Sequence, residues 1–138
     1  METEVVYGRN PVRELLAAGR RPVHRSAALP QLVDEQWLAR AGVPVRSADR
    51  AELGRIAGTS DHQGVVAEAG PYPYAQASPL LREDGPLVCL DGAQDPRNIG
   101  AVARVAEAGG AAGLAIPGRG GPGVTAVVCK ASAGAVEH

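Results

Sequence analysis

The chain has few of the residues that build metal sites or disulfides. It carries two cysteines and three histidines in 138 residues, and none of them stands at the short spacings typical of zinc ligands. Cys89 and Cys129 lie far apart in the sequence, so we expect reduced thiols buried as small apolar side chains. We therefore expect neither a metal centre nor a disulfide framework.

Long apolar runs and an excess of charge are also missing. No window approaches the roughly 20 apolar residues that cross a bilayer, and the start of the chain has no apolar run behind a basic stretch. We expect a cytoplasmic protein with no membrane partner. The net charge of −1 gives no overall argument for nucleic acid. The 45% hydrophobic and 21% charged residues are typical of a folded globular protein.

Lysine is nearly absent, whereas arginine is common and clustered. Of the 14 lysine and arginine residues, only Lys130 is a lysine. Between positions 9 and 25 the single acid Glu14 accompanies five arginines, namely Arg9, Arg13, Arg20, Arg21 and Arg25. Two interpretations stay open: a surface that faces phosphates, or the default surface cations of a GC-rich genome. Under the first, Arg9, Arg13, Arg20 and Arg21 are the candidate binding residues.

Strand and helix patterns alternate through the first half of the chain. We expect strands at 4–7, 43–48 and 64–68, and helices at 11–18, 32–42 and 50–58. For the first helix, Asn10 is the expected N-cap, Pro11 the first helical residue and Gly19 the residue after the end. The alternation predicts an α/β fold with a largely parallel or mixed sheet.

Prolines interrupt this alternation at residues 71–86, which we interpret as a linker between a domain at 1–70 and a second unit at 87–138. The second unit predicts a strand at 87–92, a helix at 98–109, a strand at 113–118 and a further helical segment from 123. A unit of about 50 residues seldom holds a parallel sheet by itself. We therefore expect it to be the first part of a larger domain, cut short at its C-terminal end.

The stretch "LDGAQDPRNIGAVARVAEAGG", residues 90–110, runs from a strand through a polar loop into a helix. Asp95 is the expected N-cap and Pro96 the first helical residue. Arg104 follows Gly100 by four positions on a face of small residues, at the carboxyl end of a strand, where open α/β sheets place ligands. The pattern leaves two interpretations: an arginine that is solvated or structural, or one that is aimed at a ligand.

Three weaker signals have structural alternatives. "GRGGPG" at 118–123 matches the dinucleotide-binding pattern G-x-G-x-x-G, but a flexible surface loop is the favoured interpretation. His62 is expected to cap a turn or to be exposed. Tyr72 and Tyr74 are suited to stacking on bases, although aromatics between prolines more often pack against a domain surface.

The 90–110 stretch resembles the first signature motif of the SpoU (TrmH) family of RNA ribose 2'-O-methyltransferases. The matching residues are Leu90, Asp91, Asp95, Pro96, Asn98, Gly100 and Arg104. "VYGRNPVRELL", "HQGVVAEAGPYPY" and "KASAGAVEH" are also similar to this family. The combination is most similar to the RlmB-like subgroup, which acts on guanosine of 23S ribosomal RNA.

This resemblance implies an N-terminal RNA-binding α/β domain similar to ribosomal protein L30e, and the first part of a dimeric, trefoil-knotted SPOUT domain. It implies RNA, and 23S ribosomal RNA in particular, as the partner, with S-adenosylmethionine as the methyl donor. The residues matching Arg104 and Asn98 are then catalytic. Because arginine is normally always protonated, we expect Arg104 to stabilise the developing alkoxide or hold a neighbouring phosphate rather than act as a base.

The chain also departs from the family pattern. "SAALP" at 26–30 interrupts the apolar strand expected there, so the first sheet is expected to be incomplete, and Val105 stands where the family often has Thr or Ser. Two later motifs, a Gly-x-Glu-Gly type loop and a Ser-Leu-Asn helix start, do not occur in the sequence. Because these motifs bind S-adenosylmethionine in the family, we expect no cofactor binding and no turnover by this chain alone. The alternatives are an RNA-binding module or a non-functional fragment.

Overall fold

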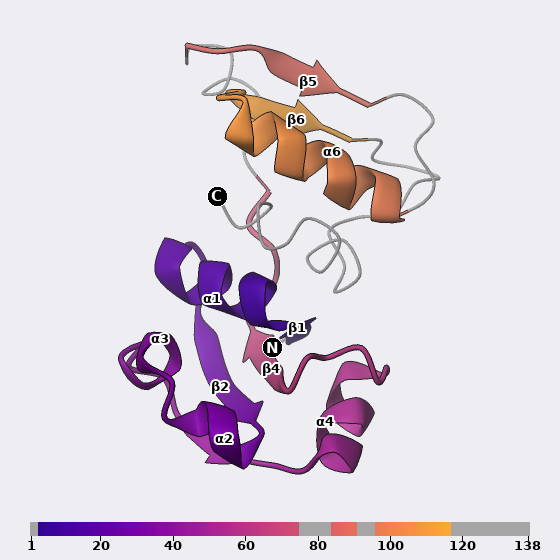
Figure 1. The fold of residues 1–138 in the computed structure, drawn as a ribbon. Helices are drawn as coiled ribbons and strands as arrows, with labels where there is room; N and C mark the ends of the chain where they lie inside the picture. Colours follow the sequence, from indigo (N-terminus) through magenta and orange to yellow (C-terminus); the bar gives the residue numbers. More distant parts are fainter. Residues whose placement is uncertain (1–2, 75–83, 91–95, 117–138) are drawn as a thin grey trace.

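The structure is a computed structural model that describes residues 3–74, 84–90 and 96–116. Its first unit is built on a four-stranded sheet in the order β1-β4-β2-β3 (Figure 1). The strands are β1 (Glu4–Tyr7), β2 (Val23–Ala28), β3 (Val45–Ser47) and β4 (Val65–Ala69). Strand β4 runs antiparallel to both β1 and β2, whereas β2 and β3 are parallel. The predicted mixed α/β sheet is confirmed.

The expectation that "SAALP" breaks this sheet was wrong. Strand β2 continues through Ser26, Ala27 and Ala28, which pair with β3 on one side and β4 on the other. All three residues are buried. Small side chains suit this position, because a central strand with a neighbour on each side leaves little room on its covered faces.

Four helices surround the sheet: α1 (Arg9–Ala18), α2 (Pro30–Val33), α3 (Gln36–Ala39) and α4 (Arg50–Ala57). Helices α1 and α4 both contact β1 and β4, while α2 contacts β2 and β3 (Figure 1). The core combines apolar side chains from the helices with residues of strand β4. These residues are Val12, Leu15, Leu38, Leu53, Val65, Val66 and Ala67, each at most 1% exposed. Burying such side chains contributes about 1.5–3 kcal/mol each.

Two helix predictions need correction. The predicted helix at 32–42 is divided into α2 and α3, because Glu35 has an extended ψ of 133° between them. Its carboxylate accepts hydrogen bonds from Arg9 and Trp37, two contacts that local propensity does not reveal. In α1 the N-cap position is Gly8, and Asn10 lies inside the helix. The predicted end of α1 is confirmed, since Gly19 caps it in the left-handed conformation.

The second unit contains the parallel strands β5 (Leu87–Cys89) and β6 (Gly113–Ala115) and the helix α6 (Pro96–Ala108). Pro96 is the first helical residue, as predicted, while the expected N-cap Asp95 lies outside the described residues. The predicted buried thiol of Cys89 was wrong, because this side chain is exposed. Figure 1 shows α6 along one face of the strand pair, and the described residues provide no second layer for the other face.

Several predictions fall beyond the described residues. These are Cys129, the "GRGGPG" loop at 118–123 and the helical segment from 123. The two sheets lie on either side of the proposed linker, of which 75–83 is not described, so the domain division stays a prediction. Across the described ranges, none of the helices has the length and apolar character required to cross a membrane.

Gly64 provides a test of the packing at the start of β4. Its φ is +84°, and an added Cβ would lie 2.9 Å from the Cδ1 atoms of Leu29 and Leu32. Gly19 has a similar φ of +62° but nothing within 4 Å of such a Cβ. We expect Gly19→Ala to lower the free energy of unfolding by about 1 kcal/mol through backbone strain. Gly64→Ala should lower it by a further 1–3 kcal/mol or so through overpacking.

Urea unfolding followed by the fluorescence of the single tryptophan measures both free energies. Equal losses for the two variants would contradict the described contact between Gly64 and the two leucines.

Candidate functional site

Three of the four candidate arginines lie at the surface around α1. Arg9 and Arg13 are one helical turn apart, and their side chains are 50% and 52% exposed. Arg9 Nη2 lies 2.9 Å from Glu35 Oε1, and Arg13 Nη2 donates to Asn10 Oδ1 at 2.8 Å. The exposed Arg20 follows the end of α1 and donates to the Pro73 carbonyl at 3.4 Å. The structure therefore brings Arg9 and Arg13 together and leaves Arg20 at the opposite end of the helix.

A pocket of about 360 Å³ opens beside the first turns of α1. Its lining residues are Arg9, Asn10, Arg13, Trp37 and Gln63. Gln63 Oε1 accepts a hydrogen bond from the Arg9 backbone N–H at 2.9 Å, which ties the loop before β4 to the start of α1. Trp37 Nε1 donates to Glu35 Oε2 at 2.9 Å. The pocket thus combines two guanidinium groups, two amides and one indole.

Arg21 is placed differently from the other three candidates. Its side chain is only 2% exposed, and its Nη1 lies 2.7 Å from Glu4 Oε2 and 3.2 Å from the Gly70 carbonyl oxygen. Its guanidinium carbon also lies 5.3 Å from the centroid of the Tyr72 ring, a cation–π geometry. In this placement Arg21 joins β1 to the end of β4, and its guanidinium does not face solvent.

The fifth arginine of the cluster, Arg25, pairs with Glu68 across β2 and β4. The hydrogen bond to the Glu68 carboxylate, and then the charge of that carboxylate, raise the pKa of Arg25 above its ordinary value. The pair neutralises the positive charge of Arg25 on this part of the surface. Together with a second pair, Arg46 and Glu52 at 2.6 Å, it lies away from the pocket beside α1.

His62 and the two tyrosines have structural contacts. His62 is 2% exposed and its Nδ1 accepts the Gly64 N–H at 2.9 Å, so the predicted turn-capping role is confirmed and exposure is not. The rings of Tyr72 and Tyr74 meet edge to face with centroids 5.0 Å apart. Tyr72 packs against Arg21, whereas Tyr74 stays 59% exposed.

The second candidate site lies on α6. Asn98 and Arg104 are both exposed, while Ile99, Gly100 and Ala103 are buried. Asn98 and Arg104 are six positions apart, which places them about 120° apart around the helix and about 9 Å apart along it. The Arg104 side chain has no hydrogen bond or ion pair with any described residue. The structure therefore exposes both side chains without bringing them into contact.

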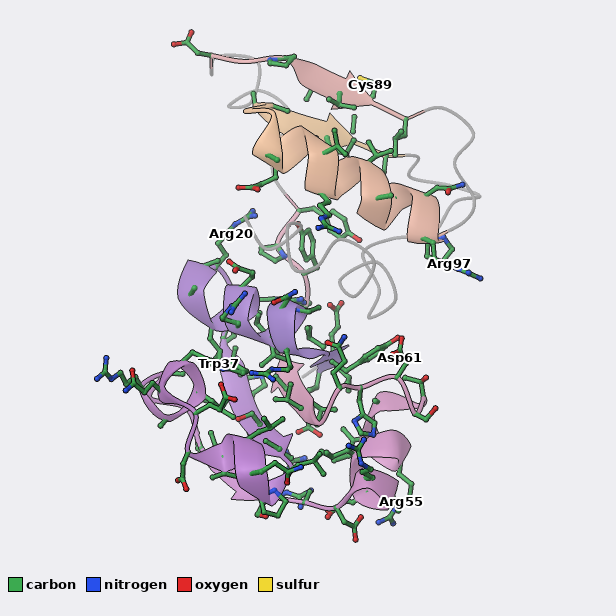
Figure 2. The ribbon with its side chains drawn as sticks, in the orientation of Figure 1. Arg20, Trp37, Arg55, Asp61, Cys89 and Arg97 are labelled. Atoms are coloured by element: carbon green, nitrogen blue, oxygen red, sulfur yellow. The ribbon has the colours of Figure 1, made fainter. Side chains whose placement is uncertain are left out.

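Arg97 is a residue that the sequence reasoning missed. It precedes Arg104 by seven positions, so the two arginines share one face of α6 with Ala101 between them, and all three residues are exposed. The spacing of seven between two arginines was a visible signal for this face. Figure 2 shows Arg97 at the N-terminal end of α6, pointing away from the strand pair.

Trp37 and Gln63 were also missed, because their proximity to Arg9 is created by tertiary contacts. In the described part of the chain, no group of His, Cys, Asp and Glu side chains is arranged to hold a metal ion.

Comparison with known families identifies the family of both units. Residues 5–75 match a family described as "RNA 2'-O ribose methyltransferase substrate binding". Residues 85–138 match the SpoU rRNA methylase family. The chain belongs to the SpoU family of RNA methyltransferases.

Curated relatives of this SpoU chain include proteins named uncharacterized tRNA/rRNA methyltransferase. The one from Mycolicibacterium gilvum is 39% identical over 146 residues, which cover 97% of this chain and 46% of the relative. The one from Mycobacterium tuberculosis is 42% identical over 145 residues, which cover 97% of this chain and 45% of the relative. The chain thus spans about half the length of the curated relatives it matches.

Solved methyltransferase structures share the fold. The methyltransferase AviRb from Streptomyces viridochromogenes, in complex with AdoMet, superposes with a TM-score of 0.74 at 25% identity, covering 96% of this chain and 52% of AviRb. An AdoMet-bound rRNA methyltransferase from Sinorhizobium meliloti gives a TM-score of 0.73 at 24% identity, covering 98% and 51%. The mixed α/β architecture expected from the resemblance is confirmed.

The described residues of the second unit do not by themselves fit S-adenosylmethionine. Helix α6 presents Asn98 and Arg104 to solvent, and β5 leaves Leu87 39% exposed. A methyl-donor site needs an enclosed cavity with several convergent polar groups.

The contrast between Arg20 and Arg21 can be tested by stability. Arg21→Met removes a buried hydrogen bond to Gly70 and a partly buried ion pair with Glu4, so we expect the free energy of unfolding to fall by about 2 kcal/mol. Arg20→Gln changes an exposed side chain and should cost less than about 0.5 kcal/mol. Urea unfolding of both variants gives the comparison. If Arg20→Gln lowers the free energy of unfolding as much as Arg21→Met does, the buried contacts of Arg21 do not stabilise the fold in the way described.

Proposed function

We propose that the chain is the RNA-recognition unit and the first part of the catalytic domain of an S-adenosylmethionine-dependent RNA ribose 2'-O-methyltransferase. The observation that carries this proposal is Arg104, which is exposed on the helix after β5 and has no described partner. It lies in the segment that matches the SpoU methylase family. The first unit supplies a cationic surface made of Arg9, Arg13 and Arg20.

The finer assignments rest on the resemblance of the sequence to the SpoU family. The proposed substrate is a guanosine of 23S ribosomal RNA, and the proposed working state is a cytoplasmic homodimer. The names of the relatives, which specify tRNA or rRNA, support an RNA substrate of this class. The division into a domain at 1–70, a linker at 71–86 and a second domain from 87 belongs to the proposal as well.

Arg104 supplies positive charge to the reaction. A ribose hydroxyl is a weak acid, so methyl transfer is accelerated when charge that develops on its oxygen is stabilised. A guanidinium holds its protons at all physiological pH values and therefore acts as an electrostatic group, not as a base. Because Asn98 lies on another side of α6, we propose that it holds a different atom of the same nucleotide.

The role of Arg104 is testable in a chimaera in which residues 1–138 replace the matching part of the Mycolicibacterium gilvum relative. We expect Arg104→Ala to lower kcat for methyl transfer by about 100-fold or more, the effect of removing one donor to a developing oxyanion. Arg104→Lys should restore part of the activity, because it keeps the charge but loses the planar fork.

Arg97→Ala is the matched control on the same face of α6. It should raise KM for RNA and leave kcat within about threefold, as expected for a phosphate contact. If Arg104→Ala changes only KM, Arg104 is a binding residue and its proposed catalytic role is wrong.

A second prediction concerns the 138-residue chain by itself. Neither of the two cofactor motifs expected from the family occurs in its sequence, and the two described pockets are both lined by residues of the first unit. We expect calorimetric titration with S-adenosylmethionine to give no binding heat above dilution. Stoichiometric binding with micromolar affinity would contradict this expectation and would place a complete cofactor site within these residues.

A further inference from the structure

We infer that the pocket beside α1 is a subsite for one unpaired nucleotide of RNA, with its base on the Trp37 indole and its phosphate on Arg13. This inference rests on the proposed function and adds the chemical form of the ligand. Figure 2 shows Trp37 beside α1, far from Arg55 on α4 and from Arg97 on α6. The subsite therefore belongs to the first unit and is separate from the candidate catalytic face.

Trp37 is held in place by its polar edge. The indole N–H donates to Glu35 Oε2, and Glu35 Oε1 binds Arg9, so one carboxylate fixes two walls of the pocket. Because the indole N–H is already bonded within the protein, the half-buried ring offers aromatic carbon surface to the pocket. Such a surface is suited to stacking on a nucleobase, because every base has a π face.

The charge of the lining favours a phosphate. Two of the five lining residues are arginines and none is a carboxylate. A guanidinium has five N–H donors, and Arg13 donates one hydrogen bond to the neutral Asn10 side chain, while its distance to Glu14 is 3.8 Å. The contact between Arg13 and Glu14 is an exposed ion pair, but it is too long for a hydrogen bond. Arg13 therefore keeps most of its N–H donors for a ligand, whereas Arg9 donates a hydrogen bond to Glu35.

Gln63 adds a group able to contact a base edge. It is the one non-glycine residue of the described chain with positive φ, at 57°, a conformation that costs on the order of 1 kcal/mol. Its side-chain oxygen is occupied by the Arg9 N–H, which leaves the amide NH2 as the donor group. Donors of this kind pair with the carbonyl and ring-nitrogen acceptors of bases.

The size of the pocket indicates the size of the ligand, and a second pocket on the same unit offers a comparison. A volume of about 360 Å³ is in the range of small-molecule sites and suits a single nucleotide. A duplex keeps its base faces stacked, so only an unpaired base can lie on the indole. The rival pocket of about 190 Å³, lined by Arg25 and Arg46 among others, has no aromatic residue and has the carboxylate of Glu68 in its lining.

The chain reports on this site directly, because Trp37 is its only tryptophan. The experiment titrates the 138-residue protein with a non-self-complementary single-stranded RNA of about eight nucleotides and follows tryptophan fluorescence. We expect saturable quenching by the single strand at low salt. The same RNA annealed to its complement, and inorganic pyrophosphate, should produce less than a third or so of that quenching at equal phosphate concentration.

Variants are compared by the anisotropy of a labelled RNA. Trp37→Leu should weaken binding about tenfold, in the range found for one stacked base, and Trp37→Tyr should stay within about threefold of the wild type. Arg13→Gln should weaken binding and reduce the slope of log K against log salt by about one. Arg55→Gln, an exposed arginine on α4, is the matched control and should change neither quantity.

The outcomes separate the subsite from the proposed function. If RNA binds but Trp37 fluorescence does not change and Trp37→Leu binds normally, the subsite is wrong while RNA recognition by the chain stands. Equal quenching by the duplex or by pyrophosphate would contradict the proposal that the ligand is an unpaired nucleotide. If no RNA binds at low salt, the subsite and RNA recognition by the first unit both fail. Should Trp37→Leu unfold, the wild-type quenching and Trp37→Tyr decide the matter.

Discussion

Strand β4 is the element on which both the fold and the candidate RNA surface depend. It pairs with β1 and β2, and its residues Val65, Val66 and Ala67 are at most 1% exposed. The start of the strand also fixes the start of α1, because the Gly8 N–H donates to the Val65 carbonyl and the Arg9 N–H to Gln63. The pocket beside α1 is thus built next to the most buried of the described strands.

The distribution of ion pairs explains how a chain with a net charge of −1 can present a cationic surface. Arg21 and Arg25 are paired with glutamates that lie on β1 and β4, and Arg46 is paired with Glu52 on α4. These pairs neutralise charge at the sheet and around α4. Around α1, residues 9–20 contain three arginines, all exposed, and one acid, Glu14, so positive charge prevails there. Local charge, and not the total, then governs where a phosphate backbone is attracted.

Local signals predicted the parts of the structure that short segments determine. Gly19 ends α1 and Pro96 begins α6, because backbone conformation alone favours these positions. The segment 32–42 was predicted as one helix because its break depends on Glu35 binding Arg9, 26 positions earlier in the chain.

The candidate sites divide in the same way. Arg104 was proposed from the pattern along one helix and Asn98 from the resemblance to the SpoU family, whereas the pocket of Arg9, Trp37 and Gln63 is assembled from three distant segments. The burial of Arg21 and the exposure of Cys89 likewise follow from which elements cover them. A pattern of residues along one element is visible in a sequence, but a surface formed between elements is not.

The most direct test of the account maps the RNA contact on the protein itself. Backbone amide spectra of the 138-residue chain are recorded with and without a single-stranded RNA, and the shifted residues are assigned. We predict that the largest shifts cluster at the start of α1, on α3 and at Gln63, with α4 and β3 unchanged. Shifts concentrated on α4 and β3, or none at saturating RNA, would contradict the claim that this face recognises RNA.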